Sequence, residues 1–312
     1  MLIDTRTLPK DERTYLELGA LYERNGYALY KMKKFEEYSL YVDNRNFLGS
    51  ESVLTFQGFG GKLMALKPDV TLSIVKNARV PEDRPLRLYY RESVYRTERG
   101  GTDFKEINQM GLECIGALDG EDVRGICALA AESLSVIDPD FIFSVSHMGY
   151  ISALLDECGV RDAAARKKVT DCIRSRNAHD LASAASEGAD TEKIARILRA
   201  GTEFSSALEI LRAASAGEGT RAAADELAAL YESFADAPYR DRIRLDLSIV
   251  NDVDYYTGII FQGYVARVPK MILSGGRYDG LLSRIGRTHN AMGFALNLGE
   301  LNVYYPRGKE EA

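Results

Sequence analysis

The chain has 312 residues, of which 46% are hydrophobic and 28% charged, and its 40 Lys and Arg against 46 Asp and Glu leave a net charge of −6. This length predicts about two domains, or one large domain with an insert, and the composition excludes a disordered or fibrous chain. The acidic balance argues weakly against a protein whose main task is to grip nucleic acid.

Other protein classes are disfavoured by features that the sequence lacks. No apolar run approaches the roughly 20 residues that a membrane span requires, and the N-terminus, Met1 to Arg6, has no apolar segment typical of a secretory signal. The four cysteines form no close pair and there are only three histidines, so we expect neither a disulfide framework nor a metal site. We therefore expect a cytoplasmic protein.

The first predicted elements are a helix and a hairpin. Apolar residues spaced three and four apart over 15–22 predict a helix, and Asn25-Gly26 would end it. The glycine-rich segment 58–61 has two interpretations, a phosphate-binding loop or a hairpin turn. Leu63 stands where a phosphate-binding loop needs Ser or Thr after its lysine, and a strand-like run follows, so the sequence favours the turn.

Residues 86–116 predict two long strands joined by a polar loop. In the second strand, period-2 alternation places Met110 and Cys114 on an apolar face and Gln109 and Glu113 on the opposite face. The apolar face must pack against a core. The opposite face either is solvated or presents an amide and a carboxylate to a ligand, and the alternation by itself favours the solvated face.

Helical spacing dominates the middle of the chain. A helix is predicted over 123–137, and residues 151–234 are rich in Ala, Arg and Glu with repeated helical periodicity. Strand patterning returns over 243–265 and again over 292–298. A strand-rich core interrupted by a helical block predicts an α+β protein, with an antiparallel sheet flanked by helices. We place the first part of the core at 1–150, the helical insert at 151–238 and the second part of the core at 239–312.

Five clusters of polar residues interrupt the strand-like segments: 67–71, 95–98, Gln109 with Glu113, 254–257 and 275–280. Carboxylates beside Thr, Gln and Tyr suit a ligand with an ammonium group, and an arginine at a strand end suits a carboxylate or phosphate. Each cluster also has a purely structural interpretation. Asp69 is equally suited to cap the following helix. The pair Tyr255-Tyr256 is more typical of a core, and Gly275-Gly276 is most economically a turn.

In this order, the clusters resemble the catalytic core of histidyl-tRNA synthetase, a class II aminoacyl-tRNA synthetase. The resembling segments are 65–71 (the family's Arg-Pro-Glu-Gly-Thr segment), 95–98 with 109–113 (motif 2 and the strand after it), 254–258 (the second histidine-specific signature), and 275–281 with 292–296 (the approach to motif 3). The resemblance covers nearly the whole chain. It implies a class II core with the helical insert between motifs 2 and 3.

The resemblance also implies a histidine pocket. The residues that match the family's motif are Asp69, Thr71, Gln109 and Glu113 on the amino and imidazole side, Arg96 facing the carboxylate, and Tyr255, Tyr256 and Tyr278 as walls. Asp69 is one methylene shorter than the glutamate of the family, which shortens its reach.

Departures from the family concern the ATP side of the site. Glu300 stands where an arginine near the end of motif 3 would hold the phosphates, and Asn251 and Asp103 replace two further arginines. Reversing a unit charge about 4 Å from a phosphate costs several kcal/mol, and adenylation needs cations on the phosphates. Lys33 replaces the proline of motif 1. The chain ends soon after motif 3, where synthetases continue into an anticodon-binding domain, so we expect no tRNA partner.

One family combines a synthetase core with these losses, the regulatory subunits of ATP phosphoribosyltransferase. The strand 141–147 leading into a helix, and Tyr255 to Gly258, are similar to that family in particular. The resemblance implies a non-catalytic subunit that the short-form catalytic subunit requires for the first step of histidine biosynthesis. It further implies histidine as effector, a homodimer within a hetero-oligomer, and no cofactor.

Two other functions remain open. The chain is alternatively a truncated histidyl-tRNA synthetase-like enzyme that activates an amino acid. It is also compatible with a small-molecule-binding paralogue that serves a different partner.

Overall fold

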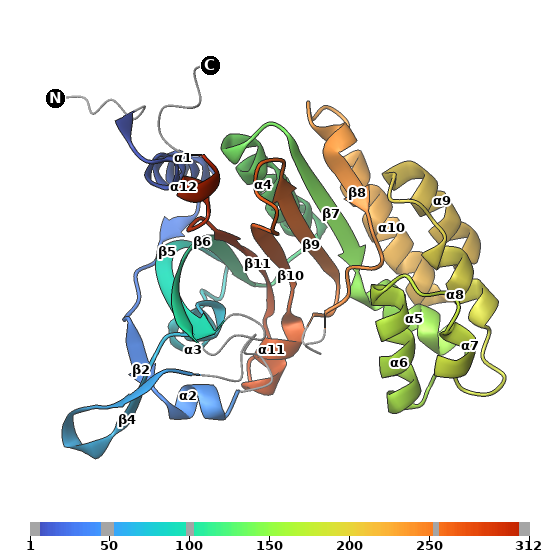
Figure 1. Cartoon of the computed structure of the whole chain (residues 1–312), viewed down its shortest axis with the longest axis horizontal. Helices are drawn as coiled ribbons and strands as arrows, with labels where there is room; N and C mark the ends of the chain where they lie inside the picture. The colour runs from blue at the N-terminus through green and yellow to red at the C-terminus, as the bar shows by residue number, and fades with distance from the viewer. Residues whose placement is uncertain (1–6, 45–52, 98–102, 252–255, 306–312) are drawn as a thin grey trace.

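The computed structural model describes residues 7–44, 53–97, 103–251 and 256–305. Its centre is an eight-stranded sheet in the order β1-β5-β6-β11-β10-β9-β7-β8 (Figure 1). Neighbouring strands are antiparallel except at the two edges, where β1 pairs with β5 and β7 with β8 in parallel. The strands are β1 (Ala28–Leu29), β5 (Leu86–Thr97), β6 (Phe104–Gly116), β7 (Phe141–His147), β8 (Ile243–Leu245), β9 (Ile259–Val265), β10 (Leu273–Arg277) and β11 (Asn290–Asn297).

One face of the sheet is apolar and is covered by α1 (Lys10–Arg24) and α4 (Gly120–Ile137). The alternation predicted for β6 is confirmed, because Met110 and Cys114 are buried in this core. The predicted first helix is confirmed as well, and Gly26, with φ +81°, takes the left-handed conformation just after its end. Asp119 caps α4 by accepting hydrogen bonds from the backbone N–H groups of its first turn.

The opposite face of the sheet carries a second, smaller apolar cluster that includes Tyr90 and Ile115. Beside it lies a three-stranded sheet of order β2-β4-β3. The predicted turn at 58–61 is confirmed, because it joins β3 and β4 as an antiparallel pair. The remaining elements on this side are β2 (Phe35–Glu37), β3 (Thr55–Gln57), β4 (Leu63–Leu66), α2 (Ser39–Val42), the 3-10 turn Phe59–Gly61, α3 (Thr71–Asn77) and α11 (Asp279–Arg284). The short helix α12 (Leu301–Tyr304) follows β11 and lies beside α1.

A block of helices lies between β7 and β8 in the chain and beside that edge of the sheet (Figure 1). Its core is continuous with the sheet, since Leu154 and Leu227 belong to the same buried cluster as Phe143. His147 ends β7 and caps the first helix by accepting the Tyr150 N–H on Nδ1 at 3.0 Å. The helices are α5 (Met148–Glu157), α6 (Ala163–Arg174), α7 (Leu181–Ala184), α8 (Thr191–Leu198), α9 (Phe204–Ala214) and α10 (Glu218–Glu232).

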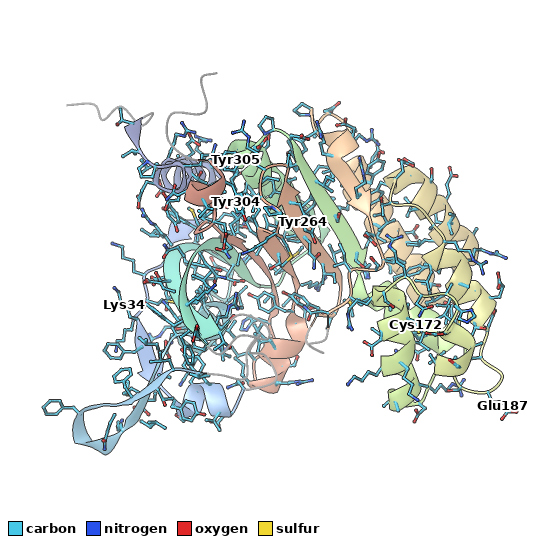
Figure 2. The ribbon with its side chains drawn as sticks, viewed as in Figure 1. Lys34, Cys172, Glu187, Tyr264, Tyr304 and Tyr305 are labelled. Atoms are coloured by element: carbon cyan, nitrogen blue, oxygen red, sulfur yellow. The ribbon has the colours of Figure 1, made fainter. Side chains whose placement is uncertain are left out.

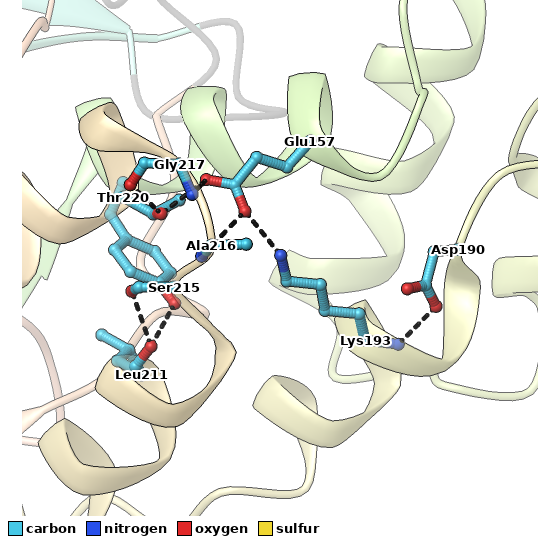
Figure 3. Close-up of polar contacts among 9 residues, drawn as sticks. Glu157, Asp190, Lys193, Leu211, Ser215, Ala216, Gly217 and Thr220 are labelled. Carbon is cyan, nitrogen blue, oxygen red and sulfur yellow. Dashed lines mark hydrogen bonds and ion pairs between the residues drawn. The ribbon is translucent and has the colours of Figure 1, made fainter.

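A single carboxylate joins three helices of this block (Figure 3). Glu157, at the end of α5, pairs with Lys193 of α8 at 2.5 Å. It also accepts hydrogen bonds from the Thr220 hydroxyl at 2.5 Å and from the Gly217 N–H at 2.9 Å. Gly217 precedes α10, so the carboxylate lies at the positive end of that helix.

Two expectations about strands are corrected by the structure. Gly275-Gly276 is not a turn but part of β10, in the middle of the sheet. A Cβ on Gly275 would lie 2.4 Å from the Gly293 carbonyl oxygen and 2.8 Å from the Phe261 ring. Glycine is therefore needed here for close packing rather than for a change of chain direction. The strand expected from 243 ends at Leu245, and a turn follows it.

The described residues contain no helix with both the length and the apolar character of a membrane span. Within the same residues, no three His, Cys, Asp or Glu side chains converge in a way that would hold a metal ion.

Candidate functional site

Glu113 is the centre of a buried hydrogen-bonded cluster on the second face of the sheet. Its side chain is 2% exposed. The Thr71 hydroxyl, at the start of α3, donates to Oε1 at 2.6 Å. The Tyr278 hydroxyl, from the end of β10, donates to Oε2. The interpretation of this face as solvated is therefore wrong, because α3 and the start of α11 cover the position of Glu113.

Glycines on the neighbouring strands make room for this cluster. Gly293 of β11 lies opposite Glu113, and a Cβ there would approach Oε2 to 2.0 Å. Tyr90 of β5 lies opposite Gly111, and a Cβ on Gly111 would lie 2.5 Å from the Tyr90 hydroxyl oxygen. The absence of a side chain at Gly293 on β11 therefore leaves room for Glu113, and the Tyr90 ring fills the space over Gly111.

Two carboxyl groups in this region have raised pKa values. Burial raises the pKa of Glu113 to about 8, and the nearby charge of Asp69 adds to the effect, while the hydrogen bonds from Thr71 and Tyr278 oppose it. Burial also raises the pKa of Asp69. Two carboxyl groups that lack full solvation are suited to a ligand with cationic or hydrogen-bond-donating nitrogen atoms.

Asp69 has a structural role in addition to its place in this cluster. It accepts the Leu72 N–H at 2.8 Å, so the interpretation of Asp69 as a helix cap is confirmed. Two residues earlier, Lys67 is fully buried and pairs with Glu92 at 2.7 Å. The segment that presents Asp69 is therefore anchored on both sides.

Next to the Glu113 cluster, the same face of the sheet forms the floor of a cleft of about 780 Å³. Its floor is polar where Ser144, Gln262 and Ser274 line up across β7, β9 and β10. Tyr264, which Figure 2 labels on β9, also lines it. The volume falls in the range of small-molecule sites, roughly 300–1,000 Å³.

Arg96 and Tyr256 connect the cleft with the Glu113 cluster. Both line the cleft. The positive charge of Arg96 partly offsets the burial that raises the pKa of Asp69. Burial and Glu113 raise the pKa of Tyr278, and Tyr256 raises it further, so these rings are close enough to interact. A ligand held by Arg96 would therefore lie beside the carboxyl groups.

The two remaining predicted pocket residues are Gln109 and Tyr255. Gln109 is buried and pairs in register with Asn297, which lines the cleft. Tyr255 lies outside the described residues. The structure thus brings together Asp69, Thr71, Glu113 and Tyr278 as one cluster, with Arg96 and Tyr256 between that cluster and the cleft.

Two of the three positions at which the family's arginines are replaced line the cleft. Asn251 lies on one wall, and Glu300 on another, where it pairs with Lys270 at 3.2 Å. Asp103 is exposed just before β6 and is not among the residues that line the cleft. An acidic side chain therefore stands in the cleft, neutralised by a neighbouring lysine.

Sequence reasoning missed Tyr90 and the polar floor of the cleft. Tyr90 lies opposite Gly111 in the β5–β6 hairpin, and the small residue across from a large one was the signal that could have found it. Gln262 alternates with Phe261 along β9, so period-2 alternation was the signal that could have placed it on the face opposite Phe261. That Gln262 lies beside Ser144 and Ser274 could be known only from the order of the strands in the sheet.

Comparisons with known proteins agree with this fold. The histidyl-tRNA synthetase family profile matches residues 6–301. An ATP phosphoribosyltransferase regulatory subunit of Geobacillus thermodenitrificans is 32% identical over 89% of this chain and 72% of that protein.

Solved structures share this fold. An ATP phosphoribosyltransferase regulatory subunit/histidyl-tRNA synthetase from Bacillus halodurans superposes with a TM-score of 0.79 at 26% identity, over 96% of this chain and 80% of that one. A chain of the ATP phosphoribosyl transferase (HisG:HisZ) complex from Thermotoga maritima has the same fold, with a TM-score of 0.73 at 18% identity over 92% of this chain and 97% of that one. The chain described here therefore belongs to the family of ATP phosphoribosyltransferase regulatory subunits, built on the class II histidyl-tRNA synthetase fold.

Proposed function

We propose that this protein is the regulatory subunit that a short-form ATP phosphoribosyltransferase catalytic subunit requires for the first step of histidine biosynthesis. The observation that carries the proposal is the contrast between two neighbouring parts of the candidate site. Glu113 is buried and bonded by Thr71 and Tyr278, whereas the cleft beside it is lined by Glu300, at the position where the resemblance to the synthetases implies a phosphate-binding arginine. One solved structure with the same fold supports the choice of partner, because it is a chain of an ATP phosphoribosyl transferase (HisG:HisZ) complex.

The protein has no synthetase activity of its own under this proposal. Glu300 is a carboxylate that would repel a triphosphate, and it pairs with Lys270 at 3.2 Å. Asn251, also in the cleft, is uncharged. Adenylation stabilises developing negative charge with cations that are already in position. These substitutions remove that stabilisation.

The ligand of the Glu113 cluster is histidine under the same proposal. Glu113, Asp69 and Thr71 would contact its imidazole and amino nitrogens, together with Gln109. Arg96 would bind the carboxylate, with Tyr255, Tyr256 and Tyr278 around the ring. Histidine acts as a feedback effector only if it binds one state of the assembly more tightly than another.

We further propose that the protein forms a homodimer within a hetero-oligomer and is located in the cytoplasm. The small sheet near Lys33 supports the homodimer because it exposes large apolar side chains. Phe35 and Phe56 stack edge to face at 5.6 Å with 47% and 36% of their surfaces exposed. Exposed apolar groups of this kind mark protein interfaces.

Reconstitution tests the proposal directly. The purified protein is mixed with a short catalytic subunit from the same genome, and the formation of phosphoribosyl-ATP is followed with and without histidine. We expect turnover only in the mixture, and we expect histidine to reduce it. Unchanged turnover of the catalytic subunit would contradict the proposed function.

A matched pair of variants tests the ligand site. Tyr278→Phe removes one donor to Glu113, and we expect it to weaken histidine binding about tenfold, measured by titration calorimetry. Tyr22→Phe is the control, because its hydroxyl bonds Ser133 at 2.9 Å on the other face of the sheet. Equal effects of the two variants would place histidine elsewhere.

The second candidate function is an amino-acid-activating enzyme, which the match to the histidyl-tRNA synthetase profile favours. Histidine-dependent exchange of pyrophosphate into ATP measures it. We expect none above background.

A further inference from the structure

One arginine of the helical block stands in a backbone conformation that favours glycine. Arg176 has φ +51° and is the only residue other than glycine with positive φ in the described part of the chain. It follows the end of α6, where the Arg176 N–H bonds the Ile173 carbonyl and the Asn177 N–H bonds the Cys172 carbonyl. This is the hydrogen-bond pattern of a Schellman helix end, whose left-handed residue is usually glycine.

The side chain of Arg176 leaves the helical block and reaches the loop that follows β8. Its Nη2 donates to Asp246 Oδ1 at 2.7 Å, and its Nη1 makes a long bond of 3.5 Å to the Ala200 carbonyl. The two partners of the ion pair are 39% and 19% exposed. One guanidinium therefore bridges the end of α6, the segment between α8 and α9, and the loop after the sheet's edge strand.

Asp246 organises that loop. The same Oδ1 accepts the Ser248 N–H at 2.9 Å and the Ser248 hydroxyl at 2.6 Å. The backbone of Asp246 makes two further hydrogen bonds: its N–H donates to the Val145 carbonyl, and its carbonyl accepts the Ile249 N–H. Asp246, Ser248 and Asn251 all line the cleft, so the loop is one of its walls.

We propose that Arg176 is a positioning residue that ties the helical block to this wall of the cleft, so that the position of the wall, and with it the affinity for histidine whose carboxylate would bind Arg96 in the same cleft, depends on this contact. The inference rests on the proposed histidine site and adds a route by which the block and the site influence each other. A left-handed backbone persists where the surrounding structure holds it in place, and here the hydrogen bonds of the helix end and the ion pair of Arg176 with Asp246 both contribute. Because coupling of this kind is reciprocal, bound histidine also favours the contact between Arg176 and Asp246.

The decisive variant is Arg176→Gly. Glycine is the residue that the helix end prefers, so the variant relieves the backbone and the fold is retained while the tether is lost. Arg212→Ala is the control. It removes an ion pair with Asp225 between α9 and α10, away from the cleft, at a helical position that alanine fits.

The first readout does not require histidine. Hydrogen exchange of the ligand-free protein should be at least about threefold faster at Ser248 and Ile249 in Arg176→Gly than in the parent protein, and unchanged there in Arg212→Ala. The second readout is calorimetric titration with L-histidine. We expect affinity to fall about three- to tenfold in Arg176→Gly and in Asp246→Asn, with a double variant no worse than either one.

The outcomes separate this inference from the proposed function. Unchanged exchange at Ser248 and Ile249 in Arg176→Gly overturns the tether, whatever histidine does. Faster exchange with unchanged histidine affinity keeps the tether but overturns the coupling. If the parent protein binds no histidine, the proposed effector is wrong, and the exchange experiment alone decides whether Arg176 holds the wall.

Discussion

Replacing Glu157 by glutamine should destabilise the helical block in a pH-dependent manner. The carboxylate is only 16% exposed and its partner Lys193 only 18%. Burial by itself raises the pKa of Glu157, but hydrogen bonds from Lys193, Thr220 and two backbone N–H groups outweigh it and hold the pKa at about 2 (Figure 3). Glutamine keeps the shape but removes the charge that these donors share.

The size of the effect follows from this pKa. A carboxyl group lowered from 4.5 to about 2 contributes roughly 3 kcal/mol at neutral pH, at about 1.4 kcal/mol per pKa unit. Because the folded pKa lies below the unfolded one, this stability is fully present above pH 4.5 and is lost as the pH falls toward 2. The deficit of Glu157→Gln should therefore be on the order of 1 kcal/mol smaller at pH 4 than at pH 7.

Urea denaturation at several pH values measures the deficit. Glu192→Gln is the matched control, because it removes an ion pair with Arg199 in the same block whose side chains are 70% and 63% exposed. Exposed pairs contribute about 0.2–1 kcal/mol. A deficit that is equal in the two variants, or one that does not shrink at low pH, would refute the reasoning.

Three further predictions concern the candidate site and its support. Burial raises the pKa of Glu113 to about 8 from 4.5, so the folded state binds its proton more tightly and stability should fall as the pH rises from 4.5 to 8. Thermal melts of Glu113→Gln should lack this decline, and a parallel decline in both proteins would contradict the assignment. Gly293→Ala places a Cβ 2.0 Å from Glu113 Oε2, and should cost about 1–3 kcal/mol and weaken histidine binding. Full affinity with an unchanged melting temperature would show that the carboxylate is free to move. Lys67→Met leaves Glu92 without its cation and should destabilise the fold by about 3 kcal/mol in urea, whereas the double variant Lys67→Met/Glu92→Gln should recover part of the loss.

Local patterns were sufficient wherever one face of an element was buried. The alternation along β6 placed Met110 and Cys114 in the core and Glu113 on the opposite face, as the structure has them. A shift of one residue would have moved every apolar side chain out of the core, so the pattern left no second register. Helical periodicity identified the block from α5 to α10 for the same reason.

Patterns failed where a contact depends on a distant strand. Gly275 looked like a turn because the sequence does not show Phe261 and Gly293 on either side of it. The burial of Glu113 could not be foreseen either. It depends on Tyr278, 165 residues away in the chain.

The sequence by itself predicted the fold class and named the candidate pocket residues, because motif order and hydrophobic period are properties of short segments. Only the tertiary structure decided which of these residues meet. It separated a buried carboxylate cluster from the cleft beside it, placed Glu300 against Lys270, and brought Arg176 to Asp246, 70 residues further along the chain. The reason is physical: burial, charge pairing and close backbone approach depend on neighbours across the sheet, and strand order is not written in any local stretch of the chain.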